Sequence, residues 1–447
     1  MGIIMSNASH QKYEEKTFPL NEHKQPSYIR VQQSLHLDGE VELSGAKNAA
    51  MVNLLSLILT QGKSIIRNVP ASDDVCNIME LLKTLGAVVC YDQELHVAQI
   101  DTTHLEGTYV SADLMKKTRA SILALGPLLA RFKKAHLAFP GGDVIGARPL
   151  DYHIKNLEKM GVVFIENGDE IIASTEQLIH RNLLLEYPSV GATENLVMAA
   201  TLTEGVTRII NAALEPEVFD FLDQLKKMGA QIEIEVPMTI KVTGVKILKP
   251  VDYELMYDRL EAGSLLLAGA ITGGYISLPQ APAHMMGLFL MKLQEVGHTV
   301  LIGKNGTGVK IKATKNPRAV DIKTAPYPGF PTDLQAPFMA MLSLARGKSL
   351  VKEAVFEHRL MHGRELIKMG AQIEIPQYDA AVIYGVDTLY GSTVIASDIR
   401  ASCALVLAGL AACGTTKVIG INHWKRGYEF LEKKLQSVGA VIDLFEE

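Results

Sequence analysis

The chain has 447 residues, a net charge of −5, 48% hydrophobic residues and 21% charged residues, a profile typical of soluble globular proteins. The acidic balance argues against nucleic acid as the main partner, because phosphate backbones require a basic face. No apolar run reaches the roughly 18 residues that span a bilayer, so we expect no membrane partner. The four cysteines form no C-x-x-C pair, so neither a zinc site nor a disulfide framework is expected.

In chain order, the first segment is a polar stretch over residues 1–28, which we expect to be a flexible extension. An apolar helix is expected over residues 51–59, directly after the segment Ser44-Gly45-Ala46-Lys47-Asn48. Later in the chain, residues 401–413 are the most apolar stretch and predict a buried helix, since Ser402 and Gly409 interrupt them.

A pattern Leu-x-x-apolar-Gly-x-x-apolar recurs six times, about 70 residues apart. Its glycines are Gly86, Gly161, Gly229, Gly297, Gly370 and Gly439. Each glycine is predicted to end an amphipathic helix in the left-handed conformation, ahead of a strand. The sequence therefore predicts six α/β repeats.

A second marker, a glycine at which an apolar helix ends and a β-rich run follows, precedes five of these six glycines. Its glycines are Gly62, Gly205, Gly274, Gly347 and Gly414. In the second repeat Lys134 takes this place, and the extra residues fall in the Gly-rich run from Pro140 to Pro149, which contains Asp143 and Arg148. A loop inserted into one repeat only is a candidate functional element. Two α/β domains of three repeats each are expected, with apolar helices inside, sheets outside and a crossing near residues 253–259.

Three familiar phosphate-, dinucleotide- and zinc-binding motifs are matched only in part. Gly62-Lys63-Ser64 and Gly347-Lys348-Ser349 resemble the end of a phosphate-binding loop but lack its first glycine. Gly303, Gly306 and Gly308 do not have dinucleotide-binding spacing. His358 and His362 are four residues apart on an expected helix, but Arg359 stands where a zinc protease needs glutamate, so no metal site is predicted.

The remaining motifs resemble those of the UDP-N-acetylglucosamine 1-carboxyvinyltransferase family, the enolpyruvyl transferases of peptidoglycan synthesis. They are Ser44–Ala50, Lys117–Ser121, Ser189–Asn195, Pro328–Gln335, Ser397–Ser402 and Lys425–Glu429. The resemblance runs from about residue 29 to the C-terminus. It implies two inside-out α/β domains built from six βαβαββ repeats. The N-terminal strand is expected to join the domain built from the second half of the chain. The implied domains are 29–46 plus 258–447, and 47–257 with a flexible loop at 138–150.

The resemblance also implies site residues. Lys47 and Asn48 match the pair that contacts phosphoenolpyruvate. Arg119, Arg148 and Arg426 match arginines that bind the charged groups of phosphoenolpyruvate or the diphosphate of the nucleotide sugar. Asp333 matches an aspartate near the sugar 3-hydroxyl. The other matching positions, at the nucleotide, the sugar and a charged pair closing the site, are Pro149, Leu150, Asp151, Tyr152, Ser189, Val190, Gly191, Val355, Asp398 and Arg400.

The implied reaction protonates C3 of phosphoenolpyruvate, adds the 3-hydroxyl of UDP-N-acetylglucosamine to C2 and then expels phosphate. Asp333 would serve as the base, and Lys47 with the arginines would neutralise the phosphate and carboxylate. No metal or organic cofactor is implied, and a cytoplasmic location is expected.

Three positions depart from the family. Asp143 stands where most members have cysteine, Tyr187 where lysine is common, and Asp73 where lysine is common. We expect Asp143 to be the general acid. That role requires the pKa of its carboxyl to be raised, because an ordinary aspartate carboxyl has a pKa of about 3.9. We also expect resistance to fosfomycin, an epoxide that alkylates the cysteine. A residue that only shapes the loop is the competing interpretation of Asp143.

Two other functions are weighed. The related shikimate-pathway transferase usually has Lys-Ser where this chain has Lys47-Asn48 and Gly-Asn-Ala-Gly-Thr at residues 117–121, which disfavours it. A catalytically silent paralogue that binds the nucleotide sugar is the alternative from another class. The departures at Asp143, Tyr187 and Asp73 motivate it, whereas the retained lysine and arginines oppose it.

Overall fold

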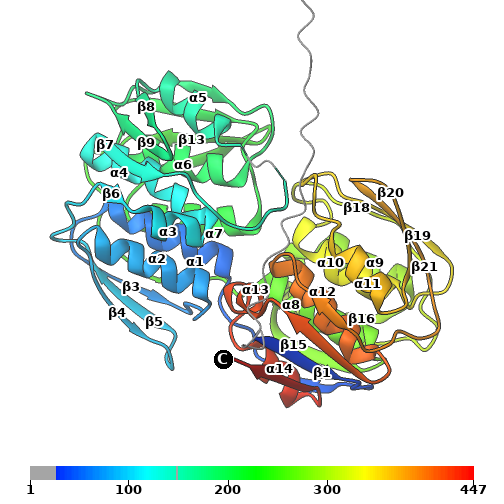
Figure 1. Cartoon of the computed structure of the whole chain (residues 1–447). Coiled ribbons are helices and arrows are strands. Elements are labelled where there is room, and N and C mark those ends of the chain that lie inside the picture. The colour runs from blue at the N-terminus through cyan, green and yellow to red at the C-terminus, as the bar shows by residue number, and fades with distance from the viewer. Residues whose placement is uncertain (1–26, 147–148, 447) are drawn as a thin grey trace, which may run out of the picture.

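The computed structural model describes residues 27–146 and 149–446. Arg148 and nearly all of the expected N-terminal extension lie outside the described residues. Two lobes, each an α/β unit, lie side by side, and the chain crosses between them near residues 45 and 257 (Figure 1). None of the described helices is long and apolar enough to cross a membrane.

Three four-stranded sheets belong to the lobe of residues 47–257, in the orders β14-β3-β5-β4, β6-β7-β9-β8 and β10-β11-β13-β12. Their strands are β3 (Lys63–Arg67), β4 (Val88–Asp92), β5 (Val97–Asp101), β6 (Tyr109–Val110), β7 (Lys134–Ala138), β8 (Val163–Asn167), β9 (Glu170–Ser174), β10 (Asn182–Leu184), β11 (Val206–Ile210), β12 (Gln231–Glu235), β13 (Thr239–Thr243) and β14 (Asp252–Glu254).

Three more sheets form the other lobe, in the orders β16-β17-β15-β2, β18-β19-β21-β20 and β22-β23-β1-β24. Their strands are β1 (Tyr28–Gln32), β2 (Asp38–Glu40), β15 (Tyr275–Pro282), β16 (Thr299–Ile302), β17 (Thr307–Lys312), β18 (Ile322–Lys323), β19 (Lys348–Lys352), β20 (Gln372–Gln377), β21 (Ala380–Tyr384), β22 (Thr393–Ile395), β23 (Thr415–Ile419) and β24 (Val441–Phe445). Strand β1 pairs with β23 and β24, so the N-terminal strand returns to the second half as expected.

The helices of the first lobe are α1 (Lys47–Ser56), α2 (Asp73–Thr84), α3 (Ala112–Lys117), α4 (Leu125–Phe132), α5 (Asp151–Lys159), α6 (Val190–Thr201) and α7 (Pro216–Lys227). Those of the second are α8 (Arg259–Ile271), α9 (Gly287–Val296), α10 (Gln335–Leu342), α11 (His362–Lys368), α12 (Ile399–Ala411), α13 (Ile421–Gly427) and α14 (Leu431–Ser437). Short 3-10 turns are η1 (Leu57–Leu59), η2 (Arg119–Ala124), η3 (Ala283–Met285), η4 (Lys304–Gly306) and η5 (Thr332–Leu334).

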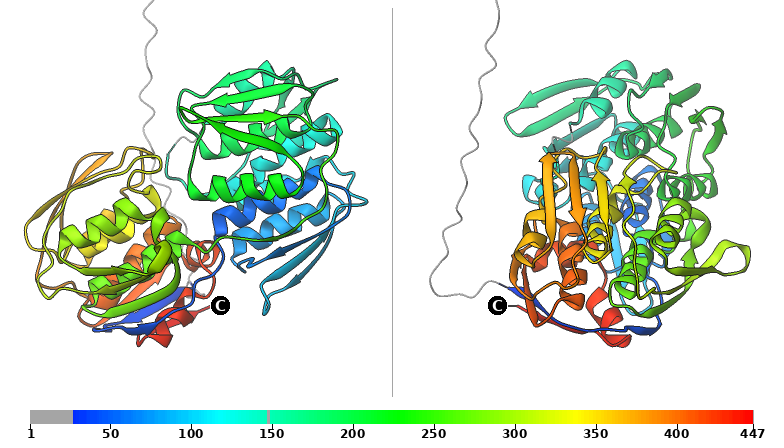
Figure 2. Two further views of the ribbon diagram at one scale, coloured as in Figure 1. Left: turned by 180° about the vertical axis from the view of Figure 1, so that it is seen from behind. Right: turned by 90° about the vertical axis from the view of Figure 1, so that its right-hand side faces the viewer.

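Apolar helices lie inside each lobe and the sheets lie outside (Figure 2). Every residue of α8, α10 and α12 is buried, which is expected of a helix that is apolar on all sides. Two separate clusters of buried side chains result, one for each lobe. In each sheet one edge pair is parallel and the other pairs are antiparallel, so the predicted inside-out fold is confirmed. We propose the limits 29–46 plus 258–447 and 47–257 for the two domains.

All six predicted cap glycines adopt a positive φ and precede a strand. Two details of the helix predictions were wrong. Helix α1 begins at Lys47, ahead of the predicted residue 51. His358 precedes α11, so it does not share a helix with His362.

The two crossing segments pair with each other. Gly45 forms an antiparallel bridge with Tyr257, and the Ala46 amide donates a 2.8 Å hydrogen bond to the Met256 carbonyl. A β-carbon on Gly45 would lie 1.7 Å from the carbonyl oxygen of Asn68. Glycine is therefore required where the chain passes from one lobe to the other.

Candidate active site

Lys47 is the first residue of α1, where the chain enters the first lobe. Its side chain is 9% exposed, and its ammonium nitrogen lies 3.1 Å from Oδ2 of Asp74 at the start of α2. Its backbone amide donates a 3.1 Å hydrogen bond to Asp258, the N-cap of α8 in the second lobe. The crossing therefore places the ammonium at the contact between the lobes, beside a buried carboxylate.

Arg426, on α13 of the second lobe, reaches the same carboxylate from the other side. Its Nε atom donates a 2.9 Å hydrogen bond to Oδ1 of Asp74, and its Nη1 atom donates a 2.7 Å hydrogen bond to Oδ1 of Asp143. Asp143 also lies 3.4 Å from Nδ1 of His423 and accepts a 3.5 Å bond from the Ile399 amide at the start of α12. The inserted loop is thus in contact with the opposite lobe.

The loop makes further contacts. Ile145 is 4% exposed, and its carbonyl accepts a 3.0 Å hydrogen bond from the His358 amide. On the near side, the Gly141 amide donates to the Met115 carbonyl at 3.0 Å. Both ends of the described part of the loop are therefore held, and Asp143 lies between them, at the contact of the two lobes.

The pKa of Asp143 contradicts the expectation for a general acid. Burial acts to raise the pKa, but the His423 imidazole and the Arg426 guanidinium outweigh it and hold the pKa of this carboxyl well below its usual range. The expected raised pKa is therefore wrong for this arrangement, because two nitrogen-bearing side chains face the carboxylate. Asp143 is ionised here at neutral pH.

A second group of charges surrounds Asp333. Arg359 and Arg400 each bind one of its carboxylate oxygens at 2.7 Å, and Arg400 also donates to the Tyr428 hydroxyl at 3.0 Å. Burial opposes the charge of Asp333, but the two guanidinium groups hold its pKa well below the usual range. Asp398 caps α12 and accepts a 2.9 Å hydrogen bond from the Arg400 amide. Of the predicted pair Asp398 and Arg400, it is therefore Arg400 that contacts Asp333.

The nucleotide-binding residues expected on the first lobe form a third region. A pocket of about 430 Å³ is lined in part by Arg119, Pro149, Leu150 and Asp151. One carboxylate oxygen of Asp151 is buried without a hydrogen-bond partner in the described part of the chain.

Residues 189–191, at the start of α6, lie close to this region. Ser189 is the N-cap of α6, and a β-carbon on Gly191 would lie 3.4 Å from the ring of His153, one turn into α5. Val190 follows the cap, and Tyr152 is the second residue of α5. The starts of α5 and α6 therefore lie side by side.

The remaining predicted residues are placed as follows. Asn48 is the second residue of α1 and is half-buried. Val355 follows β19, and its amide donates a 2.9 Å hydrogen bond to Glu353, which also accepts from Thr332 next to Asp333.

Tyr187 is half-buried, and burial together with the carboxylates of Glu215 and Glu353 raises its pKa to about 12. Tyr187 therefore stays neutral and cannot offset a phosphate charge as lysine would.

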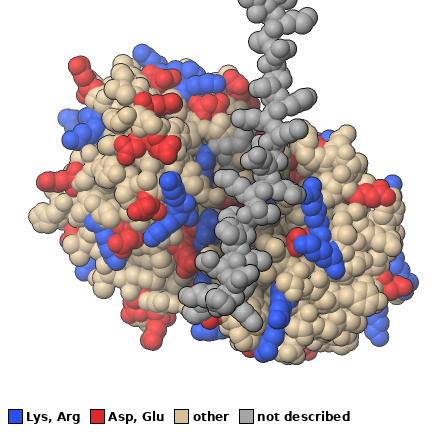
Figure 3. All heavy atoms as spheres, in the orientation of Figure 1, with Lys and Arg blue, Asp and Glu red and all other residues tan. Residues whose placement is uncertain are grey.

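Sequence reasoning missed three ionisable side chains, Asp74, Arg359 and His423. Asp74 neighbours the departure at Asp73, and Arg359 served only to exclude a zinc-protease motif. Each lies beside a predicted residue in space, but no local pattern distinguishes it from an ordinary surface charge. Charges of both signs are interspersed over the described face in Figure 3, so the site depends on these local groups rather than on a broad basic surface.

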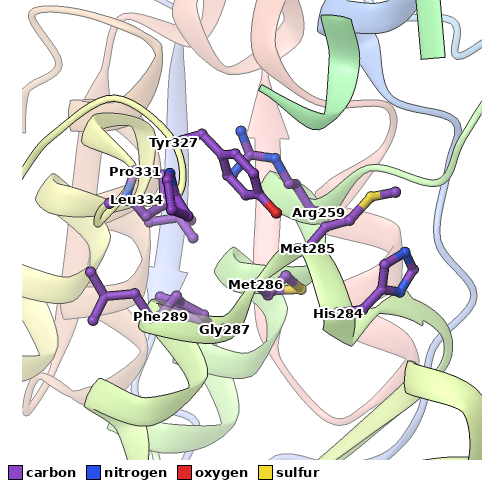
Figure 4. A pocket seen from close by; sticks show the side chains of 12 residues that line it. Arg259, His284, Met285, Met286, Gly287, Phe289, Tyr327, Pro331 and Leu334 are labelled. Atoms are coloured by element: carbon purple, nitrogen blue, oxygen red, sulfur yellow. The ribbon is translucent and has the colours of Figure 1, made fainter. Parts of the chain in front are cut away.

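A smaller pocket of about 100 Å³ adjoins the segment that carries Asp333 (Figure 4). Met285, Met286 and Phe289 make it largely apolar. Its one arginine, Arg259, forms a bidentate pair with Glu217 of the other lobe at 2.9 and 3.0 Å. That pair is a further charged contact between the lobes.

Comparison with known proteins agrees with this arrangement. The model of the family described as EPSP synthase (3-phosphoshikimate 1-carboxyvinyltransferase) matches residues 31–435. UDP-N-acetylglucosamine 1-carboxyvinyltransferase of Geobacter metallireducens is 44% identical over 412 residues, which cover 92% of this chain and 97% of that protein. The chain belongs to the UDP-N-acetylglucosamine 1-carboxyvinyltransferase family.

Other relatives extend this result. The UDP-N-acetylglucosamine 1-carboxyvinyltransferase 1 of Caldanaerobacter subterraneus subsp. tengcongensis is 42% identical, covering 92% of this chain and 98% of that protein. The solved enolpyruvyl transferase NikO from Streptomyces tendae has a TM-score of 0.85 at 23% identity, covering 94% of this chain and 99% of that chain. EPSP synthase from Acinetobacter baumannii has a TM-score of 0.73 at 15% identity, covering 94% and 100%. These two structures share the carboxyvinyltransferase fold.

Proposed function

We propose that this chain transfers the enolpyruvyl group of phosphoenolpyruvate to the 3-hydroxyl of UDP-N-acetylglucosamine and releases phosphate, the first committed step of peptidoglycan biosynthesis. The observation that carries the proposal is the meeting of Lys47 and Arg426, from opposite lobes, on either side of Asp74. Two cations held at a contact between lobes suit a small substrate with a phosphate and a carboxylate. The family membership supports the same reaction.

Each predicted residue has a proposed role. Lys47, Arg119, Arg148 and Arg426 neutralise the anionic groups of phosphoenolpyruvate or the diphosphate, and Asn48 orients the former. The nucleotide and sugar are held by Pro149, Leu150, Asp151, Tyr152, Ser189, Val190, Gly191 and Val355. Asp398 and Arg400 close the site around Asp333.

Asp333 is proposed as the base that accepts the proton of the sugar hydroxyl. Its lowered pKa keeps it ionised and able to accept a hydrogen bond. The two arginines that hold it also weaken its basicity. Asp333 can therefore act as a base only if the bound sugar weakens its ion pair with Arg359 or Arg400.

Asp143 is proposed as the acid that protonates C3 of phosphoenolpyruvate. In the described arrangement the Arg426 guanidinium binds this carboxylate, so the substrate must take over Arg426 before Asp143 can hold a proton. Closure of the lobes around the substrates would exclude water and protect the reactive intermediate from hydrolysis. Both substrates are multiply charged and do not cross a bilayer unaided, which favours a cytoplasmic location.

The test is phosphate release from phosphoenolpyruvate with UDP-N-acetylglucosamine, run in parallel with shikimate 3-phosphate. Wild type is compared with Asp143→Ala and with Val144→Ala, whose side chain is 84% exposed on the same loop. We expect release with the nucleotide sugar alone, a loss of about 10²- to 10⁴-fold in Asp143→Ala, and near wild-type release in Val144→Ala. Release that survives Asp143→Ala would reduce Asp143 to a residue that shapes the loop.

The second candidate is a silent paralogue that binds the nucleotide sugar. The neutral Tyr187 and the ionised Asp143 favour it, because both weaken expected catalytic contacts. An increase in melting temperature with UDP-N-acetylglucosamine, without turnover of either acceptor, would establish this alternative and contradict the transferase proposal.

A further inference from the structure

His423 lies beside Asp143 at the contact between the inserted loop and α13. Its Nδ1 atom is 3.4 Å from Oδ1 of Asp143 and has no well-formed hydrogen bond within the described part of the chain. His423 and Arg426 are three residues apart on α13, so both side chains lie on one face of the helix and approach the same carboxylate oxygen. The His423 side chain is 28% exposed, which leaves a route for proton exchange with solvent.

The proposed acid has no proton of its own in this arrangement, since Asp143 is ionised at neutral pH. Arg426 cannot supply one, because a guanidinium does not lose its proton in proteins. An imidazole ordinarily titrates near about 6.5. Of the two nitrogen-bearing side chains that face Asp143, only the imidazole of His423 belongs to a class that both binds and releases protons.

We propose that His423 is a positioning residue that delivers a proton to Asp143 and thereby makes it a general acid. This inference rests on the proposed transferase function. In the addition step the Nδ1 proton moves to Oδ1 of Asp143, and Asp143 then passes it to C3 of phosphoenolpyruvate, where a C–H bond forms from the electrons of the enol double bond. In the elimination step C3 returns a proton to Asp143 and then to His423, so no co-reactant is consumed.

The surrounding charges indicate what triggers the transfer. Arg426 faces the pair from α13, with Asp74 of α2 behind it and Lys47 of α1 on the far side of Asp74. From α12 come the Ile399 amide and the adjacent cap residue Asp398. An anionic substrate that engages Lys47 and Arg426 draws positive charge away from Asp143, so the carboxylate gains affinity for the His423 proton. Proton delivery is thereby coupled to substrate binding.

The test compares His423→Gln in two backgrounds. Glutamine keeps a polar side chain but carries no titratable proton. In the Asp143→Cys background a thiol, with an ordinary pKa of about 8.5, carries its own proton near neutral pH. His136→Gln is the matched control, because His136 also pairs with a carboxylate, Glu170 at 2.8 Å, between strands β7 and β9 of an outer sheet. The readouts are kcat, the KM for phosphoenolpyruvate and deuterium incorporation at C3 in D2O, from about pH 5.5 to 8.5.

We expect His423→Gln to lower kcat and C3 deuteration by about 100-fold with Asp143 present, with little change in KM. In the Asp143→Cys background the same change should cost less than about 3-fold, and His136→Gln should resemble wild type. Equal losses in both backgrounds, or a raised KM with unchanged kcat, would overturn the proposal, because His423 would then only support the structure.

If His423→Gln does not fold, the proposal can be tested by comparing the pH dependence of kcat in wild type and Asp143→Cys. With Asp143, kcat should fall as the pH rises through the range in which imidazoles ordinarily lose their proton. With Asp143→Cys it should persist to higher pH, and parallel profiles would overturn the proposal. Absence of turnover in wild type would instead refute the transferase function itself, which separates the two failures.

Discussion

Nη1 of Arg426 and Oδ1 of Asp143 lie 2.7 Å apart although 283 positions separate the two residues in the chain. Arg426 belongs to the second lobe and Asp143 to the loop inserted in the first, so the pair joins the lobes directly. The same guanidinium holds Asp74 at 2.9 Å. An anionic substrate bound by Arg426, as we propose, would meet a cation that is already engaged by two carboxylates and would have to compete with Asp143 for it.

Fosfomycin should not inactivate this protein covalently. Asp143 presents a carboxylate, held by Arg426, in place of the thiolate that the epoxide alkylates, and a carboxylate is a much weaker nucleophile. Incubation with fosfomycin followed by mass spectrometry of the intact chain should show no adduct, whereas Asp143→Cys should form one and lose activity. Rapid adduct formation on the wild-type chain at low fosfomycin concentration would contradict the role assigned to Asp143.

Lys47→Gln should lower kcat/KM for phosphoenolpyruvate by about 10²- to 10³-fold, the usual effect of removing one donor to a developing charge. The change also leaves Asp74 with Arg426 as its charged partner. Lys83→Gln is the matched control, because Lys83 pairs with Glu80 on the exposed face of α2 at 3.2 Å and such surface pairs contribute little. Steady-state kinetics on both variants measure kcat/KM. Comparable losses of kcat/KM in the two variants would argue against a substrate contact for Lys47.

The ion pairs of Asp333 with two buried arginines should make stability depend on pH. Because its folded-state pKa is lowered, the stabilisation is fully present above the unfolded value of about 3.9 and is lost as the pH falls below it. Chemical unfolding of wild type between about pH 7 and 3 should show a falling free energy of unfolding. Asp333→Asn should be less stable at neutral pH by about 3 kcal/mol, since it removes the carboxylate that Arg359 and Arg400 share, and should show a shallower slope. Identical slopes in the two proteins would refute this account.

Gly45→Ala should destabilise the protein by more than about 2 kcal/mol or prevent folding, because the added carbon would lie 1.7 Å from a backbone oxygen that cannot move freely. Gly287→Ala is the control, since a β-carbon there meets nothing within 4 Å. That change should be neutral or slightly stabilising, as expected of alanine in a helix. Thermal unfolding of both variants measures the difference, and an unaffected Gly45→Ala would show that the crossing tolerates a side chain.

Much of the fold could be predicted from the sequence because its signals are local. A left-handed glycine, an apolar helix and a following strand depend on neighbouring residues, and the same three features recur six times. The inserted loop was found because it disrupts one of these repeats. The lysine, arginine and aspartate motifs were found because they resemble a known family, and the 44% identity to a relative confirms that family.

The electrostatics of the site could not be predicted in this way. Asp74, Arg359 and His423 carry no local pattern, and their partners lie far away in the chain. The expected rise in the pKa of Asp143 was wrong because it considered burial without the two side chains that the second lobe brings to the loop. Sequence by itself determined the repeats, the family and most of the candidate residues. Only the tertiary structure decided which charges meet, because the free energy of a charge depends on its distance to others in space, not along the chain.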